Sequence, residues 1–326
     1  MKISIIIPTV FQRQEMLVDL LSDLEKLKGK SDFEIIVVDN GLEENRSLKK
    51  LIGGWHSRLP IRLIYEKQNG LHHARHTGAA AATGAILIYI DDDVRISPGW
   101  LSEYEKVFQS SSINCAGGKV IPEWEEEPPR WIKNLNRDIF SLLDYGDSER
   151  VLNEKEGING CNFAIRKDVL FRYKGFNPDG FIDPSKKWYR GDGEYGLVQR
   201  IKKGGEKIFY IPMASIVHRI SLSRISEEAI YKAVENQAFS KAYTFLRRHG
   251  CSTFSILLLI VGGAVKGFFY SLRAKLTKDQ ESHNVLYYES VKFYGIMKYT
   301  IHVLTDKHLM NFINQADYLT GTQYGI

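Results

Sequence analysis

Apolar and polar residues alternate with two different periods over the first hundred residues. Short β-branched runs at residues 3–7, 35–38, 61–65 and 86–90 predict buried strands. Leucines at helical spacing over residues 16–27 predict an amphipathic helix, and a further helix is expected over residues 74–82. Such an alternation is typical of βαβ units around a mostly parallel, Rossmann-like sheet with flanking helices. The sequence therefore predicts an α/β fold.

The pattern changes twice along the rest of the chain. Residues 115–120, 161–166 and 207–211 predict shorter strands separated by long irregular segments, and from residue 226 the pattern is helical. We therefore expect an α/β domain over residues 1–218 and a helical carboxyl-terminal region over residues 219–326. An uncharged apolar run at residues 254–265 is shorter than the ~20 residues that span a bilayer.

The composition is that of an ordinary globular protein. The chain has 326 residues, of which 44% are apolar, and its three cysteines form no CxxC pair, which argues against a disulfide framework or a zinc site. The first residues enter a strand directly without a signal-peptide pattern, so a reducing, cytoplasmic setting is expected. The net charge of +5 arises after residue 218, where 13 Lys and Arg face 8 Asp and Glu. No nucleic-acid-binding surface is predicted in the neutral first part.

Three carboxylates, Asp91, Asp92 and Asp93, directly follow the predicted strand at residues 86–90. Adjacent carboxylates repel one another by on the order of 1 kcal/mol or more per close pair unless a cation neutralises them. Mg²⁺ or Mn²⁺ takes one or two carboxylates together with phosphate oxygens, so this run suits a metal-bound diphosphate. The alternative is an acidic loop that stabilises the start of a helix expected after Ser97 and Pro98.

Several short motifs occur in a fixed order along the chain. They are Ile-Ile-Pro-Thr at residues 6–9 with Arg13, Val-Val-Asp-Asn at 37–40, Asn69-Gly70 with Ala74-Arg75, the aspartates at 91–93, Gly-Cys-Asn at 160–162 and Gly-Asp-Gly-Glu at 191–194. This set resembles the family 2 inverting glycosyltransferases of the GT-A fold, of the bacterial polysaccharide type, over about residues 3–218. The resemblance implies transfer of a sugar from a nucleotide-diphosphate donor, with UDP-hexose favoured, to a saccharide or lipid-linked saccharide.

The resemblance also implies roles for individual positions. Pro8, Thr9 and Arg13 would border the nucleoside, and Asp39 would accept a hydrogen bond from the base. Read without the resemblance, Asp39 could equally cap a turn. Arg75 would lie near the base or the diphosphate, although it could be a solvated helix charge. In the family the residue after this arginine is usually Asn, and here it is His76.

The metal assignment follows from the same resemblance. Asp91 and Asp93 would bind a Mn²⁺ or Mg²⁺ ion, and His218 matches a histidine that reaches the metal or diphosphate in some members. Asp91 would also border the nucleotide, and Asp92 would face the donor sugar or ribose. A lone histidine such as His218 could instead be structural.

Two acids near residue 190 are the candidate catalytic groups. An inverting transfer needs a base that takes the proton from the acceptor hydroxyl as this hydroxyl attacks. We assign Asp192 this role, with Glu194 orienting it or binding the acceptor, although the two roles could be exchanged. Gly191 stands where the family has a further acid. Alternatively, both acids stabilise the start of a helix.

Further donor or acceptor contacts are expected from Gly160, Asn162 and Trp188. Gly160 and Asn162 suit a narrow place beside the donor sugar, although a strand-edge glycine and a turn asparagine would give the same pattern. Trp188, like Trp124 and Trp131, could stack on sugar rings or pack within the protein.

Two other functions fit parts of the pattern. A sugar nucleotidyltransferase would share the sheet, but the loop after the first strand lacks the glycine-rich segment with Arg and Lys that such enzymes carry. A non-catalytic nucleotide-sugar-binding protein would tolerate Gly191. The apolar run at residues 254–265, with cations around it, could make a peripheral contact with the inner face of a membrane or form a buried helix.

Overall fold

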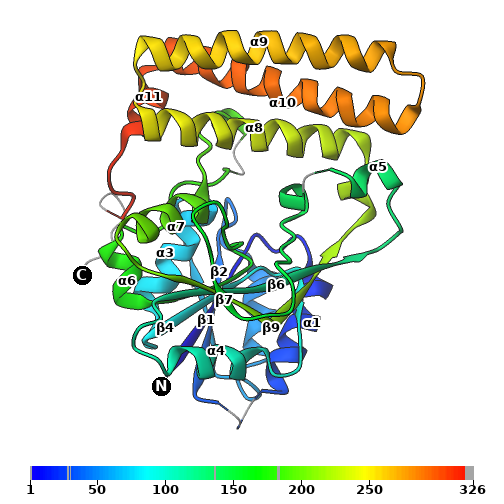
Figure 1. Ribbon diagram of the computed structural model, residues 1–326. Helices are drawn as coiled ribbons and strands as arrows, with labels where there is room; N and C mark the ends of the chain where they lie inside the picture. The colour runs from blue at the N-terminus through cyan, green and yellow to red at the C-terminus, as the bar shows by residue number, and fades with distance from the viewer. Residues whose placement is uncertain (1, 28, 30, 136, 182–183, 320–326) are drawn as a thin grey trace.

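The computed structural model describes residues 2–27, 29, 31–135, 137–181 and 184–319, so residues 320–326 of the predicted helical region lie outside it. Its centre is a nine-stranded mixed sheet, and a layer of long helices lies on one side of the sheet domain (Figure 1). The predicted α/β fold with a helical carboxyl-terminal region is therefore confirmed.

The first four strands form the parallel part of the sheet. They are β1 (Ile3–Thr9), β2 (Phe33–Asp39), β3 (Ile61–Tyr65) and β4 (Ile86–Ile90), as the apolar runs predict. β1 lies between β2 and β4, and β3 forms the edge. β1, β2 and β4 are buried along their whole length. Strands covered on both faces need apolar side chains on both, which explains their continuous β-branched runs.

Three helices connect these strands, and the third is held unusually close to the sheet. The helices are α1 (Gln14–Glu25), α2 (Arg46–Gly53) and α3 (Leu71–Ala81). α3 starts after Gly70, which has a φ of 134° and donates its N–H to Oδ1 of Asn40 at 3.0 Å. α3 packs on β1 and β2, and a Cβ at Gly78 would lie 2.4 Å from Cγ2 of Ile6. Glycine at position 78 therefore permits the close approach of the helix.

The second half of the sheet mixes strand directions. β8 (Asn162–Arg166) is antiparallel to both β4 and β6 (Cys115–Trp124), and β9 (Ile208–Ile220) is parallel to β6. β5 (Val94–Ile96) and β7 (Arg150–Val151) pair antiparallel with β9. β9 is longer than its apolar run predicts, because its second half alternates buried and partly exposed residues.

Shorter elements fill the connections. They are α4 (Trp100–Phe108), α5 (Arg130–Lys133), α6 (Lys167–Arg172), α7 (Gly193–Lys203), η1 (Arg137–Phe140), η2 (Pro184–Lys186) and η3 (Leu222–Ile225).

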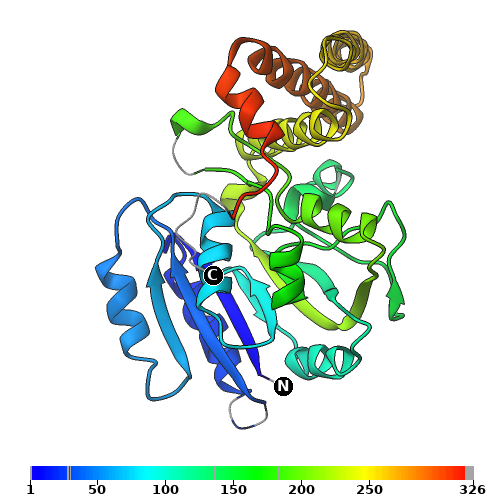
Figure 2. The same cartoon turned by 90° about the vertical axis from the view of Figure 1, so that its left-hand side faces the viewer.

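The described residues after η3 form four helices. They are α8 (Glu227–His249), α9 (Thr253–Leu276), α10 (Gln280–Thr305) and α11 (Lys307–Asn314). α10 packs against both α8 and α9, and α9 is the outermost of the three, farthest from the sheet (Figures 1 and 2). With 24 residues, α9 is twice as long as the apolar run that predicts it. Among the described residues it is the one helix long and apolar enough to cross a membrane.

We predict that Gly78→Ala lowers the free energy of unfolding by about 1–3 kcal/mol, because the added methyl group overpacks the α3–β1 contact. Gly262→Ala on α9 is the matched control, since nothing lies within 4 Å of a Cβ at that position. Because alanine has a higher helix propensity than glycine, Gly262→Ala should leave the free energy of unfolding unchanged or raise it by up to about 1 kcal/mol. Urea denaturation measures both. Equal stability of the two variants would contradict the close packing of α3.

Candidate active site

Polar residues gather at the carboxyl ends of β1, β2 and β4. Thr9, the last residue of β1, pairs in register with Asp39, the last residue of β2. The hydroxyl of Thr9 donates to Oδ2 of Asp92 at 2.5 Å and accepts from the backbone N–H of Phe11 at 2.9 Å. The strand ends therefore bring the predicted nucleotide-binding residues Thr9, Asp39 and Asp92 to one edge of the sheet.

Arg13 neutralises two of the three adjacent acids. Its guanidinium lies 2.7 Å from Oδ1 of Asp92 and also pairs with Oδ2 of Asp93. Burial raises the pKa of Asp92 to about 6, and Arg13 opposes this rise. Burial would also raise the pKa of Asp93, but His218, Arg13 and Arg224 together outweigh burial and lower this pKa to about 2. Burial likewise raises the pKa of Asp91, with Arg75 acting against it.

Strand register brings His218 to the acids from the far end of the sequence. Val94 pairs with His218 across β5 and β9, and the N–H of Arg219 donates to the carbonyl of Asp93 at 3.0 Å. Nδ1 of His218 donates to the carbonyl of Phe140 at 2.8 Å, and Nε2 lies 3.3 Å from Oδ2 of Asp93. A histidine fixed through Nδ1 in this way presents Nε2 as a metal ligand.

The residues at this edge fit a hard divalent ion. Oδ1 of Asp93 is buried and has no hydrogen-bond partner, which is a costly state for a carboxylate oxygen unless an ion binds it. Within the described ranges, however, no group of three or more His, Cys, Asp or Glu side chains is arranged to hold an ion alone. A bound ion would therefore need ligands from outside the protein, such as diphosphate oxygens.

Asp39 organises the loop that follows β2. Its carboxylate is fully buried and accepts the backbone N–H groups of Gly41 at 3.1 Å and Asn45 at 2.7 Å. Asn45 in turn caps α2. Asp39 therefore does cap the turn after β2, as the alternative reading expects. Each of its carboxylate oxygens still has a lone pair that could accept a hydrogen bond from a ligand.

Arg75 connects the metal edge to a second group of acids. It is buried on α3, and NH1 lies 3.3 Å from Oδ2 of Asp179 and 3.2 Å from Oε2 of Glu194. Burial alone would lower the pKa of Arg75, but the carboxylates of Glu194, Asp179 and Asp91 raise it. A Cβ at Gly160 would lie 2.2 Å from NH2 of Arg75, so only glycine fits there. The alternative of a solvated charge for Arg75 is therefore wrong.

The second group of acids holds carboxylates in three different environments. Oε1 of Glu194 accepts the N–H of Gly160 at 2.8 Å in addition to its pairing with Arg75. Asp192 accepts from Nδ2 of Asn177 at 2.6 Å and from the hydroxyl of Thr244 at 2.7 Å, and burial raises its pKa. Burial, reinforced by Glu194 and opposed by Arg75, raises the pKa of Asp179 to about 7.

These acids open onto a cavity of about 820 Å³. Asp179, Asp192 and Glu194 line it together with Ser240, Thr244 and Arg248 of α8. The segment between β6 and β8 supplies another part of the lining.

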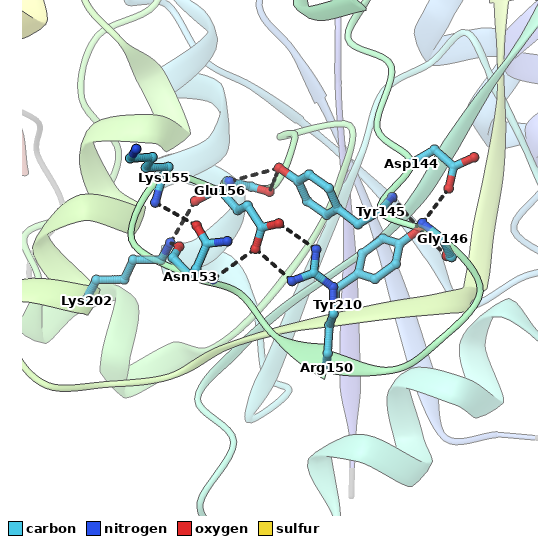
Figure 3. Close-up of polar contacts among 10 residues, drawn as sticks. Asp144, Tyr145, Gly146, Arg150, Asn153, Lys155, Glu156, Lys202 and Tyr210 are labelled. Carbon is cyan, nitrogen blue, oxygen red and sulfur yellow. Dashed lines mark hydrogen bonds and ion pairs between the residues drawn. The ribbon is translucent and has the colours of Figure 1, made fainter.

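Figure 3 shows the polar contacts that hold this segment in place. The Tyr145 hydroxyl donates to the carbonyl of Gly157 and accepts its N–H, both at 3.1 Å. Arg150 pairs with Glu156 at 2.9 Å, and Nζ of Lys202 donates to the carbonyl of Glu156 at 2.7 Å. These contacts fix the part of the cavity wall that Tyr145 and Gly157 line.

Residues 4–173, slightly more than half of the chain, match the profile described as Glycosyl transferase family 2. The chain belongs to this family.

Curated relatives of this family 2 chain come from archaea and bacteria. Glycosyltransferase AglE of Haloferax volcanii is 29% identical over 172 residues, which are 52% of this chain and 53% of AglE. A GalNAc(5)-diNAcBac-PP-undecaprenol beta-1,3-glucosyltransferase of Campylobacter jejuni is 25% identical over 224 residues, which are 67% of this chain and 65% of the relative. The chain spans about half the length of relatives such as AglE.

Two solved structures share the fold over most of the chain. The mannosyltransferase PcManGT from Pyrobaculum calidifontis, in complex with GDP-Man and Mn²⁺, has a TM-score of 0.52 at 15% identity, covering 93% of this chain and 74% of PcManGT. S. aureus TarS in complex with UDP has a TM-score of 0.50 at 14% identity, covering 94% of this chain and 92% of TarS. At these identities the likeness shows the fold alone.

One of the expected sugar contacts of the family 2 chain is wrong. Asn162 is fully buried, and its amide accepts from Trp100 and Tyr104 and donates to two backbone carbonyls, so it faces α4 and not a ligand. Trp188 packs on Phe239 and His302, with ring centroids 4.9 and 3.7 Å apart, but it is only half-buried, so its stacking on a sugar stays a prediction.

The remaining aromatics and His76 are also packing residues. Trp131 stacks on Tyr288 at 5.2 Å, and Trp124 packs edge-on against Phe140 at 5.0 Å. His76 is fully buried, and its Nε2 accepts the N–H of Phe176 at 2.8 Å.

Two site residues were not predicted from the sequence. Asp179 lies in an irregular segment without a periodic pattern. Arg224, in η3, places NH1 3.0 Å from Nε2 of His218 and 3.9 Å from Oδ2 of Asp93. The one available signal was its position six residues after His218, in the basic part of the chain.

We predict that Asn162→Ala lowers the free energy of unfolding by about 2 kcal/mol or more, because it leaves the buried donors of Trp100 and Tyr104 without an acceptor. Asn284→Ala, which removes one exposed hydrogen bond on α10, should stay within about 0.5 kcal/mol of the parent. Chemical denaturation of both variants provides the measurement. A stable Asn162→Ala protein with weakened donor binding would restore the sugar-contact role.

Proposed function

We propose that this chain is a metal-dependent, inverting glycosyltransferase that moves a sugar from a UDP-hexose to a hydroxyl of a saccharide or lipid-linked saccharide. The observation that carries the proposal is the position of Arg75, which pairs with Glu194 and Asp179 and also experiences the charge of Asp91. A donor at the strand ends and an acceptor in the cavity would meet at this arginine.

The nucleotide would lie along the carboxyl ends of the parallel strands. Thr9 and Asp39 are register partners there, Pro8 precedes Thr9 in β1, and Arg13 lies in the connection from β1 to α1. GDP-Man in PcManGT and UDP in TarS, both of the same fold, support a nucleotide donor. Arg13, Arg75 and Arg224 would provide positive charge for its diphosphate.

Asp91, Asp93 and His218 would hold the Mn²⁺ or Mg²⁺ ion together with diphosphate oxygens of the donor, with Oδ1 of Asp93 as the anchoring atom. When bound, such an ion stabilises the negative charge that develops on a departing diphosphate. Mn²⁺ in the PcManGT structure supports a divalent cofactor. Asp92, hydrogen-bonded to Thr9, would contact the donor sugar or ribose from the same edge.

Asp192 is the proposed base. Its carboxylate accepts hydrogen bonds from the neutral side chains of Asn177 and Thr244, and burial raises its pKa, so it can take a proton from an acceptor hydroxyl in the cavity. Glu194 is held in place by Arg75 and the N–H of Gly160, and this fixed position suits an orienting role. Inversion needs a single displacement, so no covalent nucleophile is required.

The acceptor would occupy the cavity next to α8. An undecaprenol-linked acceptor appears in the name of the Campylobacter relative, and a dolichyl phosphate one in that of a Haloferax relative. These names support a lipid-linked acceptor and a place of action at the cytoplasmic face of a membrane. We propose that residues 1–218 bind donor and metal and that residues 219–326 complete the acceptor side.

We predict that Asp93→Asn reduces sugar transfer by on the order of a hundredfold or more, and that added Mn²⁺ does not restore it, because the carboxylate is the anchoring ligand. Asp91→Asn should act in the same direction. Asp168→Asn, which alters an exposed pair with Arg172, is the control. Product formation from a panel of nucleotide sugars, with and without a chelator, measures the effect. Full activity of Asp93→Asn would exclude the proposed metal site.

We further predict that Asp192→Asn lowers kcat by about 10²–10⁴-fold while the donor dissociation constant stays within about twofold, because only the proton acceptor is lost. Glu194→Gln and Asp179→Asn are measured in parallel by kinetics and calorimetry. If Asp179→Asn alone removes turnover, the base is Asp179. Donor binding without turnover in the parent chain would instead favour a non-catalytic binding protein, and formation of a nucleotide sugar would favour a nucleotidyltransferase.

A further inference from the structure

The outer side of α9 carries a continuous apolar stripe. Its members are Phe254, Leu257, Leu258, Val261, Val265, Phe268, Phe269, Leu272 and Leu276, each at least 45% exposed. Successive members are one, three or four residues apart, so they share one side of the helix. Over 24 residues the stripe is about 36 Å long. Exposed apolar surface of this extent marks a binding surface.

The opposite side of α9 accounts for its attachment to the protein. A Cβ at Gly263 would lie 2.8 Å from the carbonyl of Phe293, and one at Gly267 would lie 2.8 Å from the ring of Tyr294. Small residues therefore form a close seam with α10, and Ile256 and Ala274 are buried along with them. One side of α9 therefore packs against α10, and the opposite side is apolar but exposed.

Charge along α9 itself has a single sign. Residues 250–278 contain Lys266, Arg273, Lys275 and Lys278 and no Asp or Glu. All three cations within α9 are exposed. The guanidinium of Arg273 lies over the ring of Phe269, 5.5 Å from its centroid, so this cation borders the stripe directly.

We propose that α9 lies in the plane of an anionic phospholipid membrane, with the apolar stripe among the acyl chains and its cations at the headgroups. The combination of an apolar side with unpaired positive charge is what such a surface binds. A second copy of the chain would bring like charges together across a two-fold interface, which disfavours self-association.

An in-plane position also follows from the packing of the layer. α10 contacts α9 and α8 on its two sides, so α9 cannot insert across a bilayer unless it leaves its seam or takes α10 with it. α10 carries charged residues along its length, among them Glu281, Glu289, Lys292 and Lys298. Insertion of these groups would be costly. The inference concerns binding alone and holds whether or not the chain transfers sugar.

Flotation of the full chain with phosphatidylcholine vesicles, with and without phosphatidylglycerol, tests the proposal. The parent chain should float with the phosphatidylglycerol vesicles, and high salt should weaken this binding. Val261→Asp and Phe268→Asp should each weaken it by about tenfold or more, because each places a charge in the apolar region. Lys275→Glu with Lys278→Glu should weaken binding to anionic vesicles.

Met213→Asp is the matched control, because Met213 is 65% exposed on β9, outside the helical layer. It should float like the parent, and circular dichroism should show that every variant is folded. Absence of flotation of the parent chain, or unchanged flotation of the stripe variants, would overturn the proposal. So would binding that resists alkaline carbonate extraction, which indicates a spanning helix, or a dimer that the stripe variants dissociate.

Discussion

Compensation of buried negative charge is the constraint around which this structure is arranged. Asp92 and Asp93 are each 2% exposed, and an uncompensated carboxylate in such a place costs several kcal/mol. Compensation comes from the loop after β1 through Arg13 and from β9 through His218. Because the partners are so distant in sequence, the acids can be buried only when β1, β4, β5 and β9 are all assembled. A bound divalent cation would supply the same compensation.

Arg75 compensates the negative charge of the second group of acids. Its guanidinium is almost completely buried, which is tolerable because Glu194 and Asp179 pair with it and Phe176 lies under it at 5.1 Å. Glycine at two positions makes this possible: Gly78 lets α3 approach β1, and Gly160 leaves room for the guanidinium itself. Main-chain geometry thus determines how near the two groups of acids can lie.

Prediction from the sequence succeeded where a residue directly follows an apolar run. Thr9, Asp39 and Asp91 come at the ends of buried parallel strands, and such ends share one edge of a sheet. It failed where the direction of a side chain depends on a distant partner. Asn162 belongs to a motif of the family, but the indole of Trp100 and the hydroxyl of Tyr104 turn its amide toward α4. Asp179 lies in an irregular segment and Arg224 in the four-residue η3, and neither segment has an apolar pattern that would predict its place at the site.

The boundary near residue 218 separates patterns in the sequence but not parts of the candidate site. Thr244 of α8 donates to Asp192, and Tyr299 of α10 donates to the carbonyl of Arg190 at 3.2 Å. α8 also lines the cavity, and α9 is attached to it through α10. A binding event at α9 would therefore act on a layer of packed helices that contacts the proposed base. If the acceptor is lipid-linked, the helical layer also sets the distance between the cavity and the membrane on which α9 would lie. Neighbouring helices in such a layer pack about 8–10 Å apart.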